Sequence, residues 1–548
     1  MEENTELRVI NFLVLLIIGA GFVSLLVRAF DLMVIRGDWF FTLAQENRIR
    51  QLEIVAPRGE VLDRNGRKLI TNKVNYCQKE EDGCFLISRD KALLEQAMGN
   101  QVEREYLRYY PMKDVAAHIT GYLGQVNEGE VISCSGSLDE ELIDAKVGRG
   151  GIEEQYDCLL RGQNGWKIVE ADATGKILRE LGVKEPVAGQ TVTLSVDGWL
   201  QSVVAETMEG KTGSVVALDP YSGEVLALYS SPSFDPNSFT YERNDSQISE
   251  WLNDAKGKPF FNRAITGAYH PGSVFKMISS VAGLETGAID ENTLVEDTGV
   301  LEVGEWKYAN WYWTDYGRTD GLVDIQKAIQ RSNDIFFYKL GEWTGAENLS
   351  LWGDKFGVGR PLGIDLPFEA GGILPSPEWK EKTKGEAWFL GNTYHYAIGQ
   401  GDLTMTPLQV AVETAVFANG GKLCRPYLNL ENKKNCSSVG VDNEYIEMVK
   451  SGMIKACETG GTGFTFFDFP PKVGCKTGTA EVGDGSNDSH AWFTLYAPVD
   501  NPKIVLTIFL ERGGSGSSNA GPIARIIMDK YFNLQPKVDI EEMHGEGE

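Results

Sequence analysis

Ser273 and Lys276 are the first pair of side chains in this chain whose types and spacing suit covalent catalysis. They stand three residues apart behind Pro271 and Gly272, and residues three apart on a helix are neighbours. The lysine amine can therefore reach the serine hydroxyl and take its proton, which is one way to activate a poor nucleophile. A helix that begins at Pro271 or Gly272 also offers unpaired N–H groups to an oxyanion. Because a chain of this length contains Ser-x-x-Lys matches by chance, the pair needs support from other residues.

A second candidate group is Ser332 with Asp334, just before a bulky apolar run that begins at Ile335. Both polar side chains can face a site from the start of a helix. The alternative interpretation is structural, because Ser, Asn and Asp are the usual N-cap residues of helices. Taken alone, this segment favours the cap, and both interpretations stay open.

The tripeptide Lys-Thr-Gly occurs twice, and at most one copy can serve the same site. The copy Lys476-Thr477-Gly478 is preferred, because residues 472–479 have the pattern of an edge strand followed by two more strands. An edge strand offers free backbone groups with which an extended peptide substrate can pair. Gly478 has no side chain and so lets a ligand approach the backbone. The copy at residues 211–213 is expected to be an exposed turn.

Apolar strands flank a helical middle in the larger, C-terminal part of the chain. Residues 214–218 and 224–230 are two apolar runs joined by a turn, which is the pattern of a hairpin. Residues 491–497 and 504–510 predict two further strands near the end. Strands at both ends with helices between them imply an antiparallel sheet and an α+β domain. Upstream, the polar residues 91–106 are expected to be helical.

The segment at residues 9–27 contains only Asn11 and Ser24 as strongly polar members and is long enough to span a bilayer. A cleaved signal peptide is the alternative, but no small-residue cleavage site follows. An uncleaved single-span anchor is therefore preferred. Three glutamates and Arg8 precede it, so the positive-inside rule gives little help with its orientation.

Composition and cysteine content limit the possible functions further. The 548 residues carry 52 basic and 78 acidic side chains, a net charge of −26, which argues against nucleic acid as a partner. The hydrophobic fraction of 42% is that of a globular protein. Among eight cysteines, Cys77 and Cys84, and Cys424 and Cys436, are close enough in sequence to pair, but the pairing stays open. With no C-x-x-C and five histidines, no zinc site is expected.

The order Ser-x-x-Lys, Ser-x-Asp and Lys-Thr-Gly resembles the motif set of penicillin-binding proteins and serine β-lactamases. Other matches follow the order of the family along nearly the whole chain. They are Arg58-Gly59, Asp63-Arg64-Asn65-Gly66, Gly151-Ile152-Glu153, Asp219-Pro220, Asn262-Arg263-Ala264, Pro271-Gly272-Ser273, Ile398-Gly399-Gln400-Gly401 and Thr406-Pro407. The chain therefore resembles a class B penicillin-binding protein, a single-span D,D-transpeptidase of peptidoglycan synthesis.

Within class B the chain is most similar to the elongation-type enzymes, because of Ser332-Asn333-Asp334, Trp251-Leu252-Asn253 and Trp379-Lys380. A division-type enzyme is the alternative. The resemblance implies an α+β fold with a transmembrane helix, an extended pedestal, and a transpeptidase domain whose antiparallel sheet has helices on both sides. The expected parts are a cytoplasmic N-terminus at 1–8, an anchor at 9–33, a pedestal with a short head at 40–185, the transpeptidase domain at 190–534 and an acidic tail at 535–548.

The resemblance assigns a role to each residue of the first two motifs. Ser273 attacks the carbonyl between two D-alanines of a stem pentapeptide, and neutral Lys276 takes its proton. Ser332 relays a proton to the leaving amine. Asp334 stands where many relatives have Asn, and a carboxylate there makes the charge of the neighbouring lysine less certain.

The third motif is expected to bind the substrate. Lys476 supplies positive potential, the hydroxyls of Thr477 and Thr479 hold the terminal carboxylate, and Gly478 lets the substrate approach. The backbone N–H groups of Ser273 and Thr479 form the oxyanion hole. The family chemistry needs no metal or cofactor.

The implied partners are peptidoglycan stem peptides, β-lactams, the cell membrane on whose outer face the catalytic domain lies, and a membrane-embedded glycosyltransferase of the elongation machinery. The segment between residues 63 and 148 is short for the head region that, in similar proteins, contacts such a partner. A β-lactam hydrolase or sensor and a non-catalytic scaffold are the alternatives. Rapid turnover of penicillin favours the hydrolase, and full rescue of cells by a Ser273→Ala variant favours the scaffold.

Overall fold

The structure is a computed structural model. It describes residues 3–46, 48–80, 83–98, 102–126, 146–172, 177–240 and 242–534. The chain divides into two compact units, and each is described by itself. The first unit consists of Met1–Arg58 and Arg161–Gly189, and the second of Gly59–Leu160 and Gln190–Glu548. The domain limits expected from the sequence stay a prediction.

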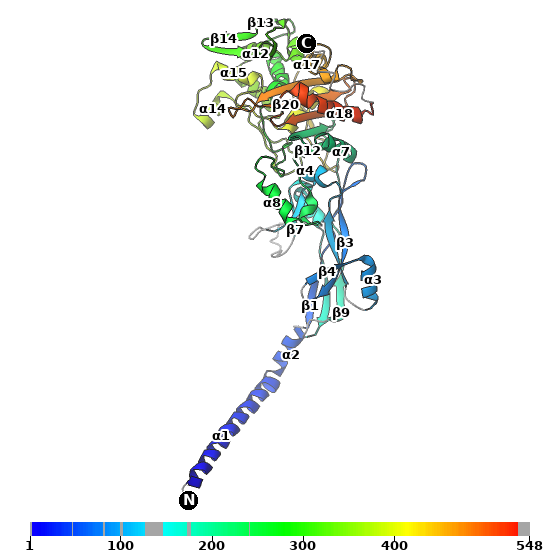
Figure 1. Cartoon of the computed structure of the whole chain (residues 1–548), viewed down its shortest axis with the longest axis vertical. Helices are drawn as coiled ribbons and strands as arrows, with labels where there is room; N and C mark the ends of the chain where they lie inside the picture. The colour runs from blue at the N-terminus through cyan, green and yellow to red at the C-terminus, as the bar shows by residue number, and fades with distance from the viewer. Residues whose placement is uncertain are drawn as a thin grey trace. The chain divides into compact units, whose positions relative to one another are not determined.

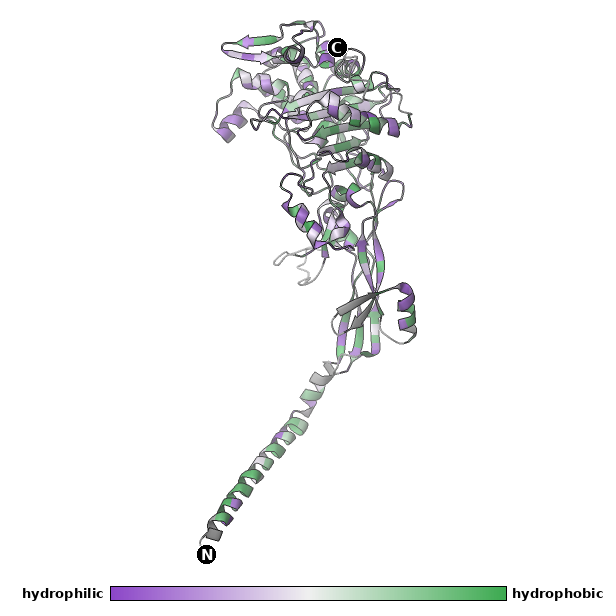
Figure 2. Ribbon diagram, viewed as in Figure 1, coloured by the Kyte–Doolittle hydropathy of each residue, from purple (hydrophilic) through white to green (hydrophobic). Residues whose placement is uncertain are grey.

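The first unit carries the apolar N-terminal helix. Helix α1 (Glu3–Phe30) continues through the π-helical turn η1 (Asp31–Ile35) and is followed by α2 (Gly37–Glu46). Residues 7–35 are long and apolar enough to cross a membrane, and hydrophobic residues line nearly the whole of α1 in Figure 2. The unit also contains an antiparallel sheet in the order β1-β8-β9. Its strands are β1 (Ile49–Ile54), β8 (Gly165–Ala171) and β9 (Ile177–Lys184).

The second unit begins with a sheet built around one long strand. Strand β3 (Lys68–Glu80) pairs with β2 (Val61–Leu62), β4 (Gly83–Ile87) and β5 (Val102–Tyr109), and β10 (Val192–Thr193) pairs with β2. The prediction of a helix over residues 91–106 is wrong in its second half. A helix, α3 (Arg89–Ala97), is present, but β5 follows it because residues 102–109 pair along the free side of β3.

Several residues of the family motifs hold this region together. Asp63 is buried, and its carboxylate accepts hydrogen bonds from the backbone N–H groups of Asn65 and Arg67 at 2.8 and 2.7 Å. Glu153 forms a fully buried ion pair with Arg108, whose Nε lies 2.5 Å from Oε1. Buried charges are tolerated when they are paired in this way. These motif residues therefore have structural rather than chemical roles.

The second unit also contains the five-stranded sheet that was expected from the strand pattern. Its order is β12-β11-β21-β20-β19, and neighbouring strands are antiparallel. The strands are β11 (Gly213–Leu218), β12 (Val225–Ser231), β19 (Gly474–Glu481), β20 (Ser489–Ala497) and β21 (Ile504–Leu510). The N-terminal hairpin therefore meets the C-terminal strands, and β19 is an edge strand, as predicted.

Alternating residues of this sheet pack into two separate cores. In β20, Phe493 and Leu495 belong to a core with α7 (Gly198–Thr207) and α18 (Gly521–Tyr531), which lie beside each other (Figure 1). Trp492 belongs to the core on the other face with α9 (Lys276–Glu285) and α16 (Pro407–Ala418). A strand has this pattern because its side chains point alternately to opposite faces. The predicted α+β fold with helices on both sides of the sheet is confirmed.

Shorter elements complete the second unit. The helices include α4 (Ala117–Thr120), α5 (Gly151–Gln155), α8 (Asp245–Asn253), α10 (Trp311–Tyr316), α11 (Ile325–Arg331), α12 (Asp334–Thr344), α13 (Ala346–Lys355), α14 (Pro377–Lys384), α15 (Leu390–Ala397) and α17 (Asn443–Ala456). The strands include β6 (Tyr122–Gln125), β7 (Lys146–Arg149), β13 (Val295–Asp297), β14 (Val300–Val303), β15 (Trp306–Ala309), β16 (Gly321–Val323), β17 (Lys422–Cys424) and β18 (Cys436–Ser438).

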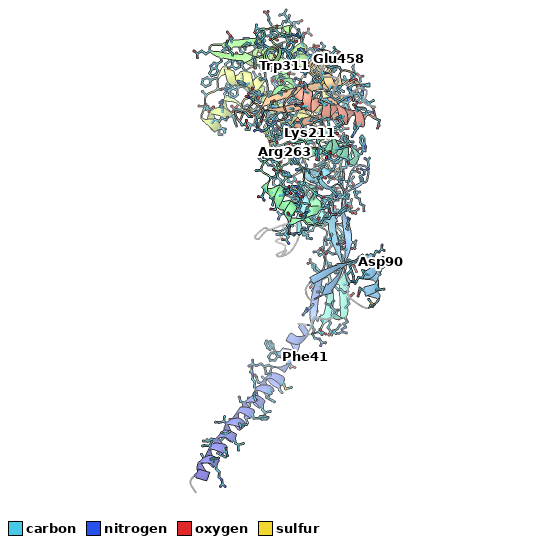
Figure 3. The ribbon with its side chains drawn as sticks, viewed as in Figure 1. Phe41, Asp90, Lys211, Arg263, Trp311 and Glu458 are labelled. Atoms are coloured by element: carbon cyan, nitrogen blue, oxygen red, sulfur yellow. A yellow bond between two sulfur atoms is a disulfide. The ribbon has the colours of Figure 1, made fainter. Side chains whose placement is uncertain are left out.

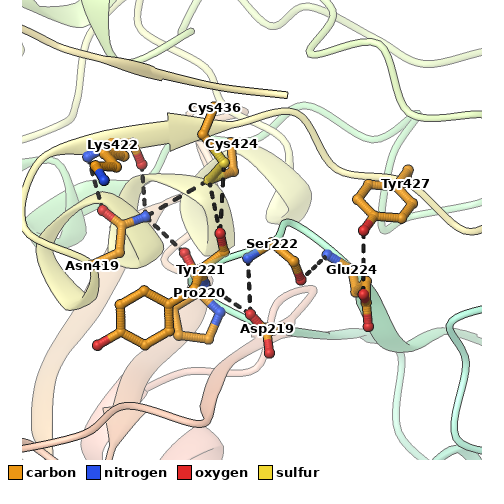
Figure 4. The surroundings of a disulfide bond; sticks show 10 residues. All are labelled: Asp219, Pro220, Tyr221, Ser222, Glu224, Asn419, Lys422, Cys424, Tyr427 and Cys436. Carbon is orange, nitrogen blue, oxygen red and sulfur yellow. Dashed lines mark hydrogen bonds between the residues drawn. A yellow bond between two sulfur atoms is a disulfide. The ribbon is translucent and has the colours of Figure 1, made fainter. Parts of the chain in front are cut away.

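Two disulfides brace the sheet region. Cys424–Cys436 joins β17 to β18, and Figure 4 shows the turn between β11 and β12 beside it. There the side-chain amide of Asn419 donates to the carbonyl of Pro220 at 2.7 Å. A second disulfide, Cys457–Cys475, ties the end of α17 to the edge strand β19 and was not foreseen.

Two other cysteines, Cys77 and Cys158, are disulfide-bonded as well. The side chain of Cys84, the nearby cysteine in sequence to Cys77, lies outside the described residues. The pairing of Cys77 with Cys84 therefore stays open. The pairing of Cys424 with Cys436, by contrast, is present in the structure.

Glu413 is a fully buried carboxyl group in the middle of α16. Neither of its carboxyl oxygens has a hydrogen-bond partner among the described residues. Burial raises the pKa of Glu413 well above its usual value, so the folded protein holds this side chain as the neutral acid.

This carboxyl group makes stability depend on pH. The pKa of Glu413 is raised in the folded state. The contribution of this group to the free energy of unfolding is therefore fully present below its ordinary pKa of about 4.3 and is lost as the pH rises toward the folded-state pKa. We expect the free energy of unfolding to fall by about 1.4 kcal/mol per pH unit in that window. Glu413→Gln should remove this slope in denaturant titrations. Glu444→Gln, at an exposed position, should keep it, and an unchanged slope in Glu413→Gln would refute the assignment.

Candidate active site

The candidate nucleophile lies on a tight turn rather than on an α-helix. Ser273 is the middle residue of the 3₁₀ turn η4 (Gly272–Val274), and α9 begins only at Lys276. The prediction that the helix begins at Pro271 or Gly272 is therefore wrong. The reason is local, because Gly272 has a φ of +56°, which an α-helix does not accommodate. The turn leaves Ser273 partly exposed while Lys276 is fully buried.

Two glycines let this turn pack directly on the edge strand. A Cβ atom at Gly478 would lie 3.0 Å from the carbonyl oxygen of Pro271, and one at Gly272 would lie 3.0 Å from the carbonyl oxygen of Thr479. Both separations are tighter than ordinary contacts, so side chains there would push β19 and the serine turn apart. Gly478 thus admits the serine turn, and its expected role in admitting a ligand stays a prediction.

Two buried lysines converge on Ser332. The Lys276 amine donates to the carbonyl oxygen of Ser332 at 2.8 Å and lies 3.5 Å from its Oγ. The Lys476 amine donates to the same Oγ at 2.8 Å and to the carbonyl oxygen of Thr477 at 2.9 Å. Both lysine side chains are 0% exposed. The structure therefore brings the second motif and both lysines into one cluster.

Asp334 supplies the negative charge of this cluster. Its Oδ1 accepts a hydrogen bond from the Lys276 amine at 2.6 Å, and its Oδ2 accepts one from the backbone N–H of Trp311 at 3.0 Å. Trp311 is labelled in Figure 3. The carboxylate is thus fixed from both sides and forms a buried ion pair with Lys276.

The backbone explains why Ser332 and Asp334 both face the lysines. Ser332 ends α11 in the left-handed region with a φ of +54°, which costs about 1–2 kcal/mol for a residue with a side chain. Asn333 is the N-cap of α12, and its Oδ1 accepts from the backbone N–H of Phe336 at 2.9 Å. The capping role considered for this segment belongs to Asn333. Ser332 and Asp334 remain free to contact the lysines.

Burial controls the charges of the two amines. Burial lowers the pKa of Lys276, and the nearby Asp334 carboxylate raises it in part. The pKa of Lys476 lies well below its usual value, first because of burial and then because of the charge of Lys276. One carboxylate therefore faces two amines, and burial favours the neutral form of both lysines.

The Ser273 hydroxyl has no hydrogen-bond partner among the described residues. The amine of Lys276, predicted to take its proton, is directed to Asp334 and Ser332 instead. Hydrogen bonds of catalytic groups often tighten only when substrate is bound. The proton transfer from Ser273 to Lys276 therefore stays a prediction.

The two hydroxyls of the third motif differ in their surroundings. Thr477 is buried and donates to the Oγ1 of Thr462 at 2.8 Å. Thr479 is exposed, and its Oγ1 accepts from the backbone N–H of Gly516 at 3.1 Å. The other Lys-Thr-Gly copy lies where β11 begins, with Lys211 exposed (Figure 3). It does not take part in the cluster.

Sequence reasoning missed the residues that support the cluster from behind. Asp297 and Asn310 are buried polar residues that contact Asn333 and Asp334, and Thr462 contacts Thr477. None belongs to a recognised motif. The only signal in the sequence is the turn-forming run at residues 297–299, which by itself indicates a loop.

Comparisons with known proteins show the family to which the chain belongs. Residues 213–529 match the penicillin-binding protein transpeptidase domain, and residues 86–194 match the penicillin-binding protein dimerisation domain. The chain is 31% identical to the peptidoglycan D,D-transpeptidase MrdA of Acinetobacter baumannii, over 98% of this chain and 90% of that protein. This chain belongs to the penicillin-binding protein transpeptidase family.

Similar solved structures indicate which class of penicillin-binding protein this chain belongs to. Penicillin-binding protein 2 of Helicobacter pylori in complex with MreC superposes with a TM-score of 0.78 at 28% identity, covering 88% of this chain and 99% of that one. A peptidoglycan synthase complex that coordinates polymerization and crosslinking contains a chain with the same TM-score and identity, covering 96% of this chain and 99% of that one. The prediction of an elongation-type class B penicillin-binding protein is confirmed.

The depressed pKa of Lys476 predicts a conflict between stability and function. At neutral pH the unfolded protein carries the protonated amine and the folded protein disfavours it, so stability is lost as the pH falls through the folded-state pKa. Lys476→Met should therefore raise the melting temperature at about pH 7 and flatten its pH dependence, while acylation by penicillin is lost. Lys503→Met, at an exposed position, should change neither property. A Lys476→Met protein that melts below the unmodified protein from about pH 6 to 9 would contradict this account.

Proposed function

We propose that Ser273 is the nucleophile of this elongation-type peptidoglycan D,D-transpeptidase. The observation that carries the proposal is the convergence of Lys276 and Lys476 on Ser332, next to a serine turn packed on the edge strand β19. This arrangement provides a base, a proton relay and positive potential beside one partly exposed hydroxyl.

Acylation starts with the neutral form of Lys276. The amine takes the proton of Ser273 as the serine oxygen attacks the carbonyl carbon between the two D-alanines. The bond to the leaving D-alanine then breaks, and its nitrogen needs a proton. Ser332 is hydrogen-bonded by Lys476 and lies 3.5 Å from the amine of Lys276, so it can pass that proton on.

The edge strand supplies binding and charge stabilisation. We assign the oxyanion hole to the backbone N–H groups of Ser273 and Thr479, whose segments touch through Gly272. Losing one such donor typically costs about 3 kcal/mol. The exposed Thr479 hydroxyl suits the terminal carboxylate of the stem peptide, and that carboxylate would favour the protonated form of Lys476, which burial disfavours in the free protein. Thr477 supports this end of β19 through its hydrogen bond to Thr462.

The acyl-enzyme is resolved by an amine from a neighbouring stem peptide. That nitrogen attacks the ester carbonyl, the bond to the Ser273 oxygen breaks, and the proton of the amine returns to the serine through Lys276 or Ser332. The product is a new amide cross-link. A β-lactam forms the same ester, but the opened ring stays attached and blocks the approach of the amine.

Labelled penicillin tests the nucleophile. Ser273→Ala should reduce covalent labelling of the purified protein to background, because the ester cannot form. Ser279→Ala is the matched control: this serine lies on α9, directly after the serine turn, is buried, and donates to the carbonyl of Ala397 at 2.8 Å. It should keep its labelling. Unchanged labelling of Ser273→Ala would remove the assignment, and rapid release of the label from the unmodified protein would favour a β-lactam hydrolase.

We further propose that α1 anchors the protein in the cell membrane and that the catalytic unit lies on the extracytoplasmic side. The disulfides Cys424–Cys436 and Cys457–Cys475 support this orientation, because such bonds persist mainly in oxidising compartments. A periplasmic or outer-surface location is also where stem peptides are cross-linked.

A topology experiment tests this orientation. Alkaline phosphatase fused after the catalytic unit should be active in whole cells, because it needs an oxidising compartment to form its own disulfides. The same reporter fused before residue 7 should be inactive. The reverse pattern would refute the proposed orientation.

The proposed partners are stem peptides, β-lactams and a membrane-embedded glycosyltransferase of the elongation machinery. The similar chain in a complex that coordinates polymerization and crosslinking supports the last of these. Part of the segment predicted to form a short head, residues 127–145, lies outside the described residues. Co-purification of the full-length protein from membranes with the glycosyltransferase of the same cell is the test of this partner.

A further inference from the structure

A buried carboxylate behind the active site accepts four hydrogen bonds. Asp297 is 3% exposed, and its Oδ1 accepts from the backbone N–H of Gly299 at 2.8 Å. Its Oδ2 accepts from the side-chain amides of Asn310 and Asn333, both at 2.9 Å, and from the backbone N–H of Asp320 at 2.8 Å. All four donors are neutral N–H groups. The carboxylate therefore gathers three separate chain segments around one charge.

The first of these segments, residues 310–311, contacts Asp334, the carboxylate that pairs with Lys276. Since the amide nitrogen of Asn310 is bound to Asp297, its amide oxygen points away and accepts from the backbone N–H of Asp334 at 3.1 Å. The next residue, Trp311, donates its backbone N–H to the Oδ2 of Asp334 at 3.0 Å. Residues 310 and 311 thus hold Asp334 by both its backbone and its side chain. The other oxygen of Asp334 is left facing Lys276.

The second segment contains Asn333 and fixes the Ser332 corner, which is the turn at residues 332–333 between α11 and α12. Asn333 is fully buried, and its amide nitrogen binds Asp297 at 2.9 Å and Asp320 at 3.1 Å. Asp320 in turn pairs with Arg331, whose Nε lies 2.9 Å from its Oδ1. The strained φ of Ser332 persists because its neighbours on both sides are held in this way.

We propose that Asp297 is a positioning residue that, through Asn310 and Asn333, holds Asp334 against Lys276 and Ser332 between the two lysines. This inference rests on the proposed function. Asp297 touches neither the nucleophile nor the lysines, so it acts only through the residues that it orients. The carboxylate is suited to this task because it accepts on both oxygens, whereas an asparagine accepts on one and offers a donor on the other.

The pH dependence of acylation depends on the groups that face Lys276. Lys276 is faced by Asp334 from α12, by Lys476 from β19, by the Ser332 corner and by the Phe337 ring at 5.2 Å. Of these, the Asp334 carboxylate raises the pKa of Lys276 against the effect of burial. If Asp334 is no longer held in place, the neutral lysine becomes available at lower pH, although the geometry of attack worsens.

The test measures acylation of full-length protein by a fluorescent penicillin across pH. We expect Asp297→Asn to slow acylation by about 10-fold or more, because a displacement of about 1 Å in a catalytic group can cost roughly 100-fold. We also expect the acid limb of its rate profile to move to lower pH. Asn310→Ala removes only the side chain that links Asp297 to Asp334 and should have the same two effects. It replaces Asp297→Asn as the test if that variant does not fold.

Asp365 provides a matched control in the same unit. It is 4% exposed and also accepts four hydrogen bonds, from the backbone N–H groups of Leu428 and Asn429, the amide of Asn432 and the hydroxyl of Tyr156. None of these partners contacts the lysine cluster. Asp365→Asn should lower the melting temperature but leave the acylation rate within about 2-fold and the acid limb unmoved.

The outcomes separate the two proposals. If the unmodified protein reacts with penicillin but Asp297→Asn and Asn310→Ala keep its rate and acid limb, as Asp365→Asn should, the positioning role is refuted and the proposed function stands. If the unmodified protein does not react, both proposals fail. Slower acylation with a shifted acid limb only in Asp297→Asn and Asn310→Ala supports the inference.

Discussion

The candidate active site depends on two lysine amines that are held out of water beside a single serine, Ser332. Lys276 and Lys476 are both fully buried, and Ser332 lies between them. One carboxylate, Asp334, faces this pair of amines, so the cluster cannot carry two full positive charges without a large desolvation penalty. Burial therefore favours the neutral form of both lysines, which is the form that a general base requires.

The surrounding structure holds this cluster next to the turn that carries Ser273, the proposed nucleophile. The serine turn touches β19 through Gly272 and Gly478, where no side chain fits. Strand β19 is tied to α17 by the Cys457–Cys475 disulfide and to the sheet by β20. The Ser332 corner is fixed from the opposite side by Asn333. Backbone contacts and buried hydrogen bonds thus set distances that flexible side chains alone would not maintain.

Prediction from sequence succeeded where the chemistry or the periodicity is local. The hairpin at residues 214–230 and the final strands were expected from apolar runs separated by turns, and the sheet contains all of them. It failed at residues 102–109, where a distant partner decides: these polar residues form a strand because β3 offers them a free side. It also failed at the start of α9, where the positive φ of Gly272 produces a 3₁₀ turn.

The sequence by itself determined the inventory of this protein: an apolar N-terminal segment, an α+β catalytic unit, and three short motifs whose order marks a penicillin-binding transpeptidase. Only the tertiary structure decided which groups meet. It directs Lys276 to Asp334, assigns the helix cap to Asn333, and brings Asp297 from 37 positions upstream of Asp334 to support them. The reason is that motifs record residue types at short spacing, whereas buried hydrogen bonds and ion pairs join segments far apart in the chain, and their strength depends on burial that no local pattern shows.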